Sequence, residues 1–136
     1  MAIDYGKKRT GLAVTDPLRI IANRLTTVAT SELWTFLSQY LGKEEVSCFV
    51  VGYPVQMNNQ ASEAVQYINP FIEKLRLTYP SIPVELADER FTSVLAHRAM
   101  LDGGLKKKER QNKELVDSIS ATIILQSYLE KNRMHQ

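Results

Sequence analysis

Cysteine is almost absent from this sequence, because Cys48 is the only one in 136 residues and no intrachain disulfide can form. Cys48 lies within the apolar run 47–51, which is typical of a small buried side chain rather than a reactive thiol. A run of about 18 apolar residues, the length needed to span a membrane, is also missing. The first residues lack the basic and apolar segments of a signal peptide. We therefore expect a cytoplasmic protein with no membrane partner.

An excess of one sign of charge is also absent, since 17 Lys and Arg residues nearly balance 15 Asp and Glu residues. The formal net charge is only +2, so bulk charge does not indicate a nucleic-acid partner. One local block is basic, Lys106-Lys107-Lys108-Glu109-Arg110, and it lies in a segment without apolar periodicity that we expect to be mobile. The two histidines, His97 and His135, do not have the spacing of zinc ligands, and residues 6–11 do not form a Walker loop.

The length and the 44% hydrophobic content are typical of one soluble domain, which we place over residues 1–136. Residues 1–5, 9–15 and 25–29 read as three strands with short connections, which favours an antiparallel meander. A helix over 33–41 follows, with Ser31 as its expected N-cap and Gly42 as its end. The first strand is very short, unless further residues precede Met1.

The second half alternates between strands and helices. The continuous apolar run 46–51 predicts a strand that is buried on both faces and has parallel neighbours. Helix 61–75 contains Pro70, which we expect to kink or split it. A strand over 84–89, a helix over 94–101 and a final helix over 112–130 complete the pattern. The result is an α/β fold, a mixed five-stranded sheet of three antiparallel and then two parallel strands, with helices on both faces.

Four carboxylates are predicted either to be partly buried, which costs free energy for a charged group, or to lie at one edge of the sheet. Asp4 ends the first strand, Asp88 and Glu89 end the fifth, and Asp117 lies on the inward face of the final helix. The carboxyl ends of parallel strands meet at one edge, about 4.8 Å apart. Hydrolysis of a phosphodiester by two metals needs several carboxylates around the cations, and Mg²⁺ prefers oxygen ligands. The pattern indicates a metal-dependent hydrolytic site.

Each acid also has a structural alternative. Asp4 could cap the turn that follows it or pair with Arg9, and Asp88 or Glu89 could pair with Arg90. Asp117 could form a salt bridge or favour the start of its helix. These alternatives stay open at the level of the sequence.

The turn after Asp4 is basic and glycine-rich. Lys7, Lys8 and Arg9 follow one another, and Gly6 and Gly11 remove side chains where a phosphate or a second backbone could approach. The stretch is therefore consistent with an anion site beside the carboxylate of Asp4.

Four motifs, in order along the chain, together resemble the YqgF family, also called RuvX-like and related to Holliday junction resolvases. They are Asp4-Tyr5-Gly6-Lys7-Lys8-Arg9-Thr10-Gly11-Leu12-Ala13-Val14-Thr15-Asp16, Val51-Gly52-Tyr53-Pro54, Asp88-Glu89-Arg90-Phe91-Thr92-Ser93, and Val116-Asp117-Ser118-Ile119-Ser120-Ala121 with its continuation through Leu125 to Leu129. The resemblance implies an RNase H-like fold and a metal-dependent nuclease linked to maturation of the 5′ end of precursor 16S rRNA.

Matched motif to motif, the family's catalytic acids correspond to Asp4, Glu89 and Asp117. The resemblance implies that these three, with Asp88 in support, hold Mg²⁺ or Mn²⁺. One departure concerns the resolvases proper, which carry a glutamate at the end of strand four, where this chain has Gly52-Tyr53-Pro54. We expect RNA as the first choice of substrate and branched DNA as the second, and we leave open a monomer or a homodimer. The basic residues expected to contact nucleic acid are Lys7, Lys8, Arg9, Arg90, Lys106, Lys107, Lys108 and Arg110.

Two other classes of function compete with the nuclease. An actin-like nucleotide-binding protein also places a strand, an aspartate and a glycine turn against phosphates, but 136 residues leave no second lobe to close over a nucleotide. A non-catalytic binding or ribosome assembly factor would have the same phosphate-binding turn and unused acids.

Overall fold

The computed structural model describes residues 1–16, 18, 21–54, 65–88 and 113–134. Five strands form one mixed sheet in the order β3-β2-β1-β4-β5. The strands are β1 (Ala2–Tyr5), β2 (Arg9–Thr15), β3 (Ala22–Ala29), β4 (Phe49–Tyr53) and β5 (Val84–Asp88). The helices are η1 (Thr30–Glu32), α1 (Leu33–Leu41), α2 (Val65–Thr78) and α5 (Lys113–Met134).

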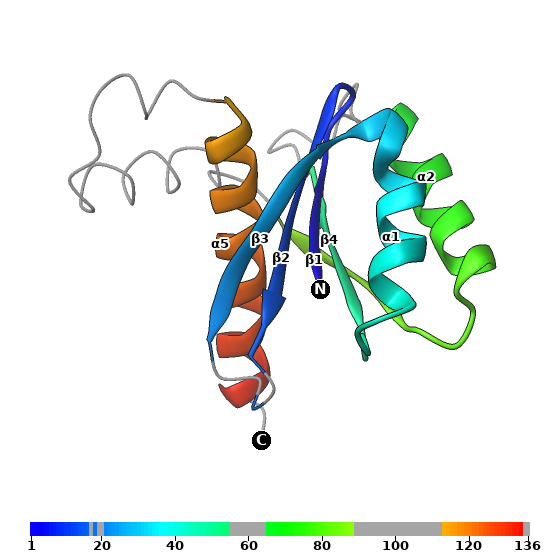
Figure 1. Ribbon diagram of the computed structural model, residues 1–136. Helices are drawn as coiled ribbons and strands as arrows, with labels where there is room; N and C mark the ends of the chain where they lie inside the picture. The colour runs from blue at the N-terminus through cyan, green and yellow to red at the C-terminus, as the bar shows by residue number, and fades with distance from the viewer. Residues whose placement is uncertain (17, 19–20, 55–64, 89–112, 135–136) are drawn as a thin grey trace.

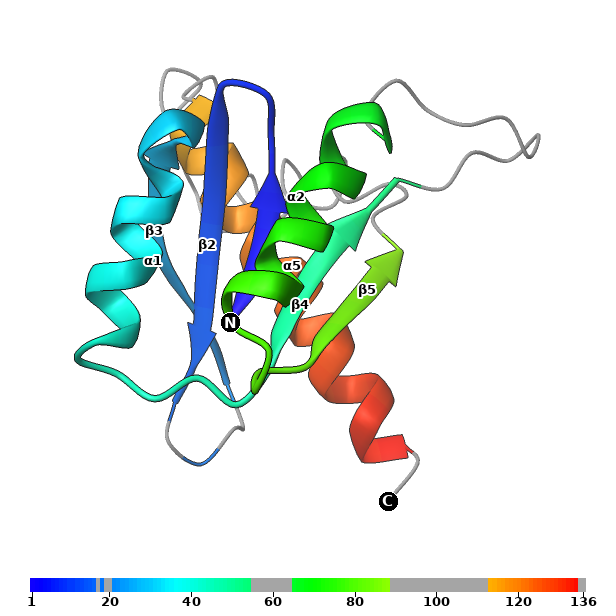
Figure 2. The same cartoon turned by 90° about the vertical axis from the view of Figure 1, so that its right-hand side faces the viewer.

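The direction of the strands follows from the length of their connections. Short turns join β1, β2 and β3, and these strands pair antiparallel, with Asp4 opposite Gly11. A helical connection precedes each of β4 and β5, and β1, β4 and β5 run parallel (Figure 2). The predicted mixed sheet, antiparallel and then parallel, is confirmed.

Large apolar side chains fill the space between the sheet and the helices α1 and α2. This face of the sheet contributes Ile3, Leu12, Phe49 and Val51, all fully buried. The two helices contribute apolar residues at helical spacing to the same core, among them Leu33, Leu37, Ile68, Phe71, Ile72 and Leu75. This is the larger part of the hydrophobic core, and it positions β1 and β4 at the centre of the sheet.

The opposite face is covered by α5 alone among the described helices (Figure 1). Its sheet residues are small, since Ala2, Ala13 and Val50 pack here against Ala121 and Leu125 of the helix. Small side chains let a helix approach a sheet closely, so α5 lies directly on β2 and β1.

Several predicted boundaries differ from the structure. β3 begins at Ala22 rather than Leu25, because it pairs with β2 over the full length of that strand. The expected cap at Ser31 is wrong, because a 3₁₀ turn occupies Thr30–Glu32 and Glu32 precedes α1 without a side-chain cap. Helix α2 continues through Pro70 and is not split. The predicted helix over 94–101 and the loop over 105–112 lie outside the described residues.

The 22-residue α5 is the longest of the described helices. Neither α5 nor any other helix in the described parts of the chain is both long and apolar enough to cross a membrane.

Candidate active site

Asp4 stands near the carboxyl end of the central strand β1 and is half-buried. Side chains alternate along a strand, so Asp4 shares the face of Ala2, which packs against α5. Its partner across the antiparallel ladder is Gly11 of β2. Asp4 therefore lies at the edge of the α5 interface rather than in the larger core.

Gly11 brings the start of α5 onto the sheet. A Cβ added to Gly11 would overlap the carbonyl oxygen of Asp117 and would come within 2.9 Å of the Ser118 amide nitrogen. Only a residue without a side chain permits this approach of two backbones. Asp4 is thus the ladder partner of the residue that the Asp117 backbone contacts.

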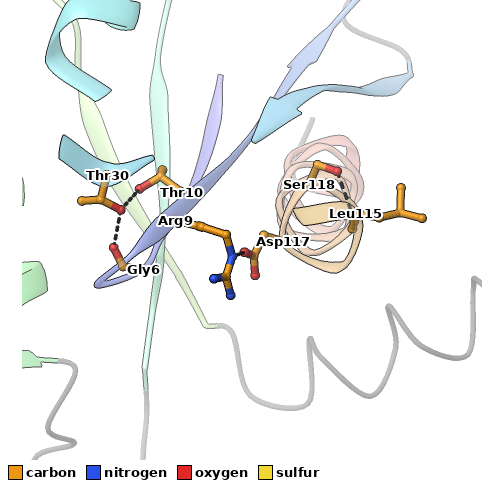
Figure 3. Close-up of polar contacts among 7 residues, drawn as sticks. All are labelled: Gly6, Arg9, Thr10, Thr30, Leu115, Asp117 and Ser118. Atoms are coloured by element: carbon orange, nitrogen blue, oxygen red, sulfur yellow. Dashed lines mark hydrogen bonds and ion pairs between the residues drawn. The ribbon is translucent and has the colours of Figure 1, made fainter. Parts of the chain in front are cut away.

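Arg9 forms an ion pair with Asp117, with 3.0 Å between Nε and Oδ2 (Figure 3). The two side chains remain 32% and 26% exposed, so water screens the pair in part. Arg9 and Gly11 are two residues apart in β2 and share the face that meets α5. The salt bridge, one of the structural alternatives for Asp117, is therefore present, and it sits within the candidate site.

Asp88 is placed differently from Asp4. It pairs with Tyr53, whose side chain packs against the larger core on the α1 and α2 side, whereas Ala87 packs on the α5 side. Asp88 therefore has the parity of the opposite face of the sheet. Asp88 and Asp4 thus belong to opposite faces of the sheet by parity, and the supporting role of Asp88 in a metal site stays a prediction.

The remaining predicted site residues, Glu89, Arg90, Lys106, Lys107, Lys108 and Arg110, lie outside the described residues. Within the parts that are described, no three histidine, cysteine, aspartate or glutamate side chains are grouped closely enough to hold a metal. Asp4 and Asp117 supply two carboxylates, which matches the one or two protein carboxylates that usually hold Mg²⁺. The described residues thus fit part of a divalent-cation site.

The turn between β1 and β2 carries the exposed side chains of Lys7 and Lys8 next to this pair of acids. Thr30, directly after β3, holds the turn through its amide, which donates to Lys8, and through its hydroxyl, which donates to Gly6 (the latter in Figure 3). Sequence reasoning missed Thr30, because no local pattern links residue 30 to residues 6–8. Only the pairing of β3 with β2 brings them together.

Charge differs between the two ends of the sheet. A pocket of about 480 Å³ lies at the end far from the turn, and its lining includes Asp16, Glu44 and Glu45. Burial and the nearby Glu44 carboxylate both raise the pKa of Tyr40 in this lining. An acidic pocket repels a polyanion, so nucleic acid is expected at the basic turn instead.

Comparisons with known proteins identify the family of this chain. A family model described as RuvX, Holliday junction resolvase, matches residues 1–131. A protein of Phocaeicola vulgatus with the name "Putative pre-16S rRNA nuclease" is 67% identical over 98% of this chain and 96% of the relative. Proteins of the same name from Bacteroides thetaiotaomicron and Porphyromonas gingivalis are 62% and 55% identical, covering 96% and 94% of their own lengths. The chain belongs to the RuvX family, and its sheet is the RNase H-like sheet of that family.

Proposed function

We propose that this protein is a nuclease that hydrolyses phosphodiester bonds during processing of the 5′ end of precursor 16S rRNA. The observation that carries the proposal is the position of Gly11, which pairs with Asp4 and is approached by the Asp117 backbone, in the strand that follows a basic turn. Metal-assisted hydrolysis uses carboxylates that hold the metal ion, and basic side chains near them can bind the phosphates of the substrate. The names of the close relatives support the choice of substrate.

The carboxylates of Asp4 and Asp117 would hold Mg²⁺ or Mn²⁺, with Glu89 as the third ligand. When bound, such a cation lowers the pKa of a water molecule and neutralises charge that develops on the leaving oxygen. Arg9 orients the Asp117 carboxylate through its Nε–H and keeps its terminal nitrogens for a phosphate. Lys7 and Lys8 would bind flanking phosphates and set the register of the substrate.

The parity of β5 does not favour Asp88 as the third acid. Successive residues of a strand alternate between faces, and Ala87 packs on the face of Asp4. In the sequence, Glu89 has the parity of Ala87, and Asp88 has that of Tyr53 on the other face. We therefore keep Asp4, Glu89 and Asp117 as the proposed catalytic set and leave Asp88 out of it.

A branched-DNA resolvase is the second candidate, because the matching family model is described as a Holliday junction resolvase. The described contacts read phosphates, which RNA and DNA share. A cytoplasmic location and a single domain, monomeric or homodimeric, remain predictions.

A cleavage assay separates these candidates. Substrates are an RNA with the 5′ leader of precursor 16S rRNA, a four-way DNA junction, and linear RNA and DNA of matched length, each with Mg²⁺, Mn²⁺ or EDTA. We expect metal-dependent cleavage of the leader RNA, reduced more than about 100-fold by Asp4→Asn, because a cation ligand is lost. Asp16→Asn changes an aspartate at the acidic end of the sheet and serves as the matched control.

Three results would contradict the proposal in different ways. Cleavage of the junction alone would identify a resolvase. Binding without cleavage of any substrate would identify an assembly factor. Cleavage that survives Asp4→Asn would remove Asp4 from the catalytic set.

A further inference from the structure

Thr30 makes three hydrogen bonds around the basic turn, and Figure 3 shows the two that involve its hydroxyl. Its hydroxyl donates to the Gly6 carbonyl at 2.6 Å, and its amide donates to the Lys8 carbonyl at 3.0 Å. The hydroxyls of Thr10 and Thr30 are 2.9 Å apart. Because the single proton of Thr30 Oγ1 goes to Gly6, Thr10 must be the donor in this third bond. The chain of donors therefore runs from buried Thr10 through Thr30 to the turn.

These bonds fix the Gly6–Lys7 and Lys8–Arg9 peptide planes, one on each side of the Lys7-Lys8 pair. In a trans peptide the carbonyl and the amide of one plane point in opposite directions. With the Gly6 carbonyl turned toward Thr30, the amide of Lys7 in the same plane points away from Thr30. Among the described residues, no acceptor binds that amide.

The side of the turn away from Thr30 is the side of the candidate site. Thr10 and Arg9 are neighbours in β2, so their side chains lie on opposite faces of the sheet. Thr10 contacts Thr30 on one side of the strand, and Arg9 contacts Asp117 on the other (Figure 3). An outward amide and the exposed ammonium groups of Lys7 and Lys8 thus belong to one short turn.

We propose that the Gly6–Arg9 turn is a seat for one backbone phosphate of the nucleic acid, and that Thr30 is the positioning residue that sets it. The Lys7 amide and the ammonium groups of Lys7 and Lys8 bind the phosphate oxygens. Thr30 does not touch the substrate; it holds the carbonyls back so that the amide is presented without reorganisation. The inference rests on the proposed function, because it takes the turn as a contact with the substrate.

Binding in EDTA tests the seat without any contribution from metal or cleavage. The probe is a fluorescein-labelled single-stranded 12-nucleotide RNA, with the dissociation constant measured by anisotropy between 50 and 200 mM KCl. Thr30→Val removes the hydroxyl, Thr30→Ser retains it, and Lys7→Ala/Lys8→Ala removes the charges. Thr26→Val, in β3 four residues before Thr30, is the matched control, because the Thr26 hydroxyl contacts the Thr27 carbonyl and not the turn.

We expect Thr30→Val to weaken binding about three- to tenfold, the range of one net hydrogen bond. The salt dependence should flatten by about 0.7 in log–log slope, as expected for one lost phosphate contact on a single strand. Thr30→Ser should restore both values, and Thr26→Val should bind like the unaltered protein. In the double-lysine background, Thr30→Val should cause little further loss, because the two changes disable the same seat.

The outcomes separate the inference from the function on which it rests. Equal binding by the unaltered protein and the double-lysine variant would remove the turn from the interface. If the double-lysine variant loses affinity for RNA while Thr30→Val binds fully, the turn stays in the interface and only the role of Thr30 is overturned. Weaker binding with an unchanged salt slope, and a lower melting temperature, would make Thr30 a structural residue only. If the valine prevents folding, Thr30→Ala, which adds no methyl group in place of the hydroxyl, carries the same test.

Discussion

The two faces of the five-stranded sheet differ in the size of the side chains that they carry. The face toward α1 and α2 carries Ile3, Leu12 and Phe49, whose large side chains hold those helices away from the sheet. The face toward α5 carries Ala2, Gly11 and Ala13, and the helix backbone touches the strand. The first face contributes apolar area to stability, while the second brings charged groups close together.

This difference explains where the candidate site forms. The Asp117 backbone reaches the ladder partner of Asp4 because nothing bulky stands between β2 and α5 at Gly11. Had the two faces been exchanged, the same acids would be held apart by the width of a leucine layer. The four predictions that follow test this division of roles, from the largest expected effect to the smallest.

Replacing Gly11 should cause the greatest damage. Gly11→Ala places a methyl group on the backbone of Asp117, so α5 must shift, and we expect a loss of at least about 3 kcal/mol in the free energy of unfolding. Urea denaturation measures it. Gly42→Ala is the matched control, since its new Cβ would lie 3.4 Å from the Ser38 carbonyl oxygen, an ordinary contact. Equal stability of the two variants would disprove the close approach of α5.

Removing apolar volume from the other face should cost nearly as much but spare the site. Leu37→Ala empties a fully buried position in α1, and such truncations cost about 2–5 kcal/mol. Leu77→Ala, at a side chain that is 82% exposed, should change stability by less than about 0.5 kcal/mol. At a temperature where Leu37→Ala remains folded, its affinity for RNA should match that of the unaltered protein. A large loss of affinity would show that the two faces are not independent.

The ion pair between Arg9 and Asp117 should contribute little to stability. Because both side chains are partly exposed, a double-mutant cycle with Arg9→Gln and Asp117→Asn should give a coupling energy below about 1 kcal/mol. Salt should reduce the coupling further. A coupling energy of 3 kcal/mol or more would assign the pair a structural role and weaken the case for Asp117 as a ligand.

The smallest expected effect is a change in the alkylation rate of Cys48. This measurement probes the α5 face without a substitution. Burial raises the pKa of the Cys48 thiol, and the contact of its Sγ with the Tyr128 hydroxyl at 3.9 Å opposes that only in part. Since the thiolate is the reactive form, alkylation by iodoacetamide at pH 8 should be slower than for free cysteine and should accelerate as the pH rises. The protein unfolded in urea provides the reference rate. Equal rates in the folded and unfolded protein would show that α5 does not shield this position.

Much of the fold could be predicted because its signals are local. Short turns and alternating residues predicted the three antiparallel strands, and the apolar run before Gly52 predicted a buried parallel strand. The inward face of the last helix was also predicted correctly, as Ala121 and Ile124 are buried. These features depend on residues within a few positions of each other, where periodicity carries the information.

The features that escaped prediction depend on distant pairing. The start of β3 at Ala22 is set by its partner strand, and the bonds from Thr30 to the turn cross the same ladder. The salt bridge was one alternative for Asp117, but its partner Arg9 is 108 residues away. The face of Asp88 follows from the register of β5 against β4, which a list of acids does not reveal. The three-acid metal site itself stays a prediction.

The separation of Arg9 and Asp117 along the chain also has a consequence for synthesis on the ribosome. At about 5–20 residues per second, the 108 residues from Arg9 to Asp117 take roughly 5–20 s to be added, so the hairpin exists long before its helix. During this time the strand face with Ala2, Ala13 and Val50 has no α5 to cover it. A nascent chain therefore cannot form the Arg9–Asp117 ion pair until the last helix has been made.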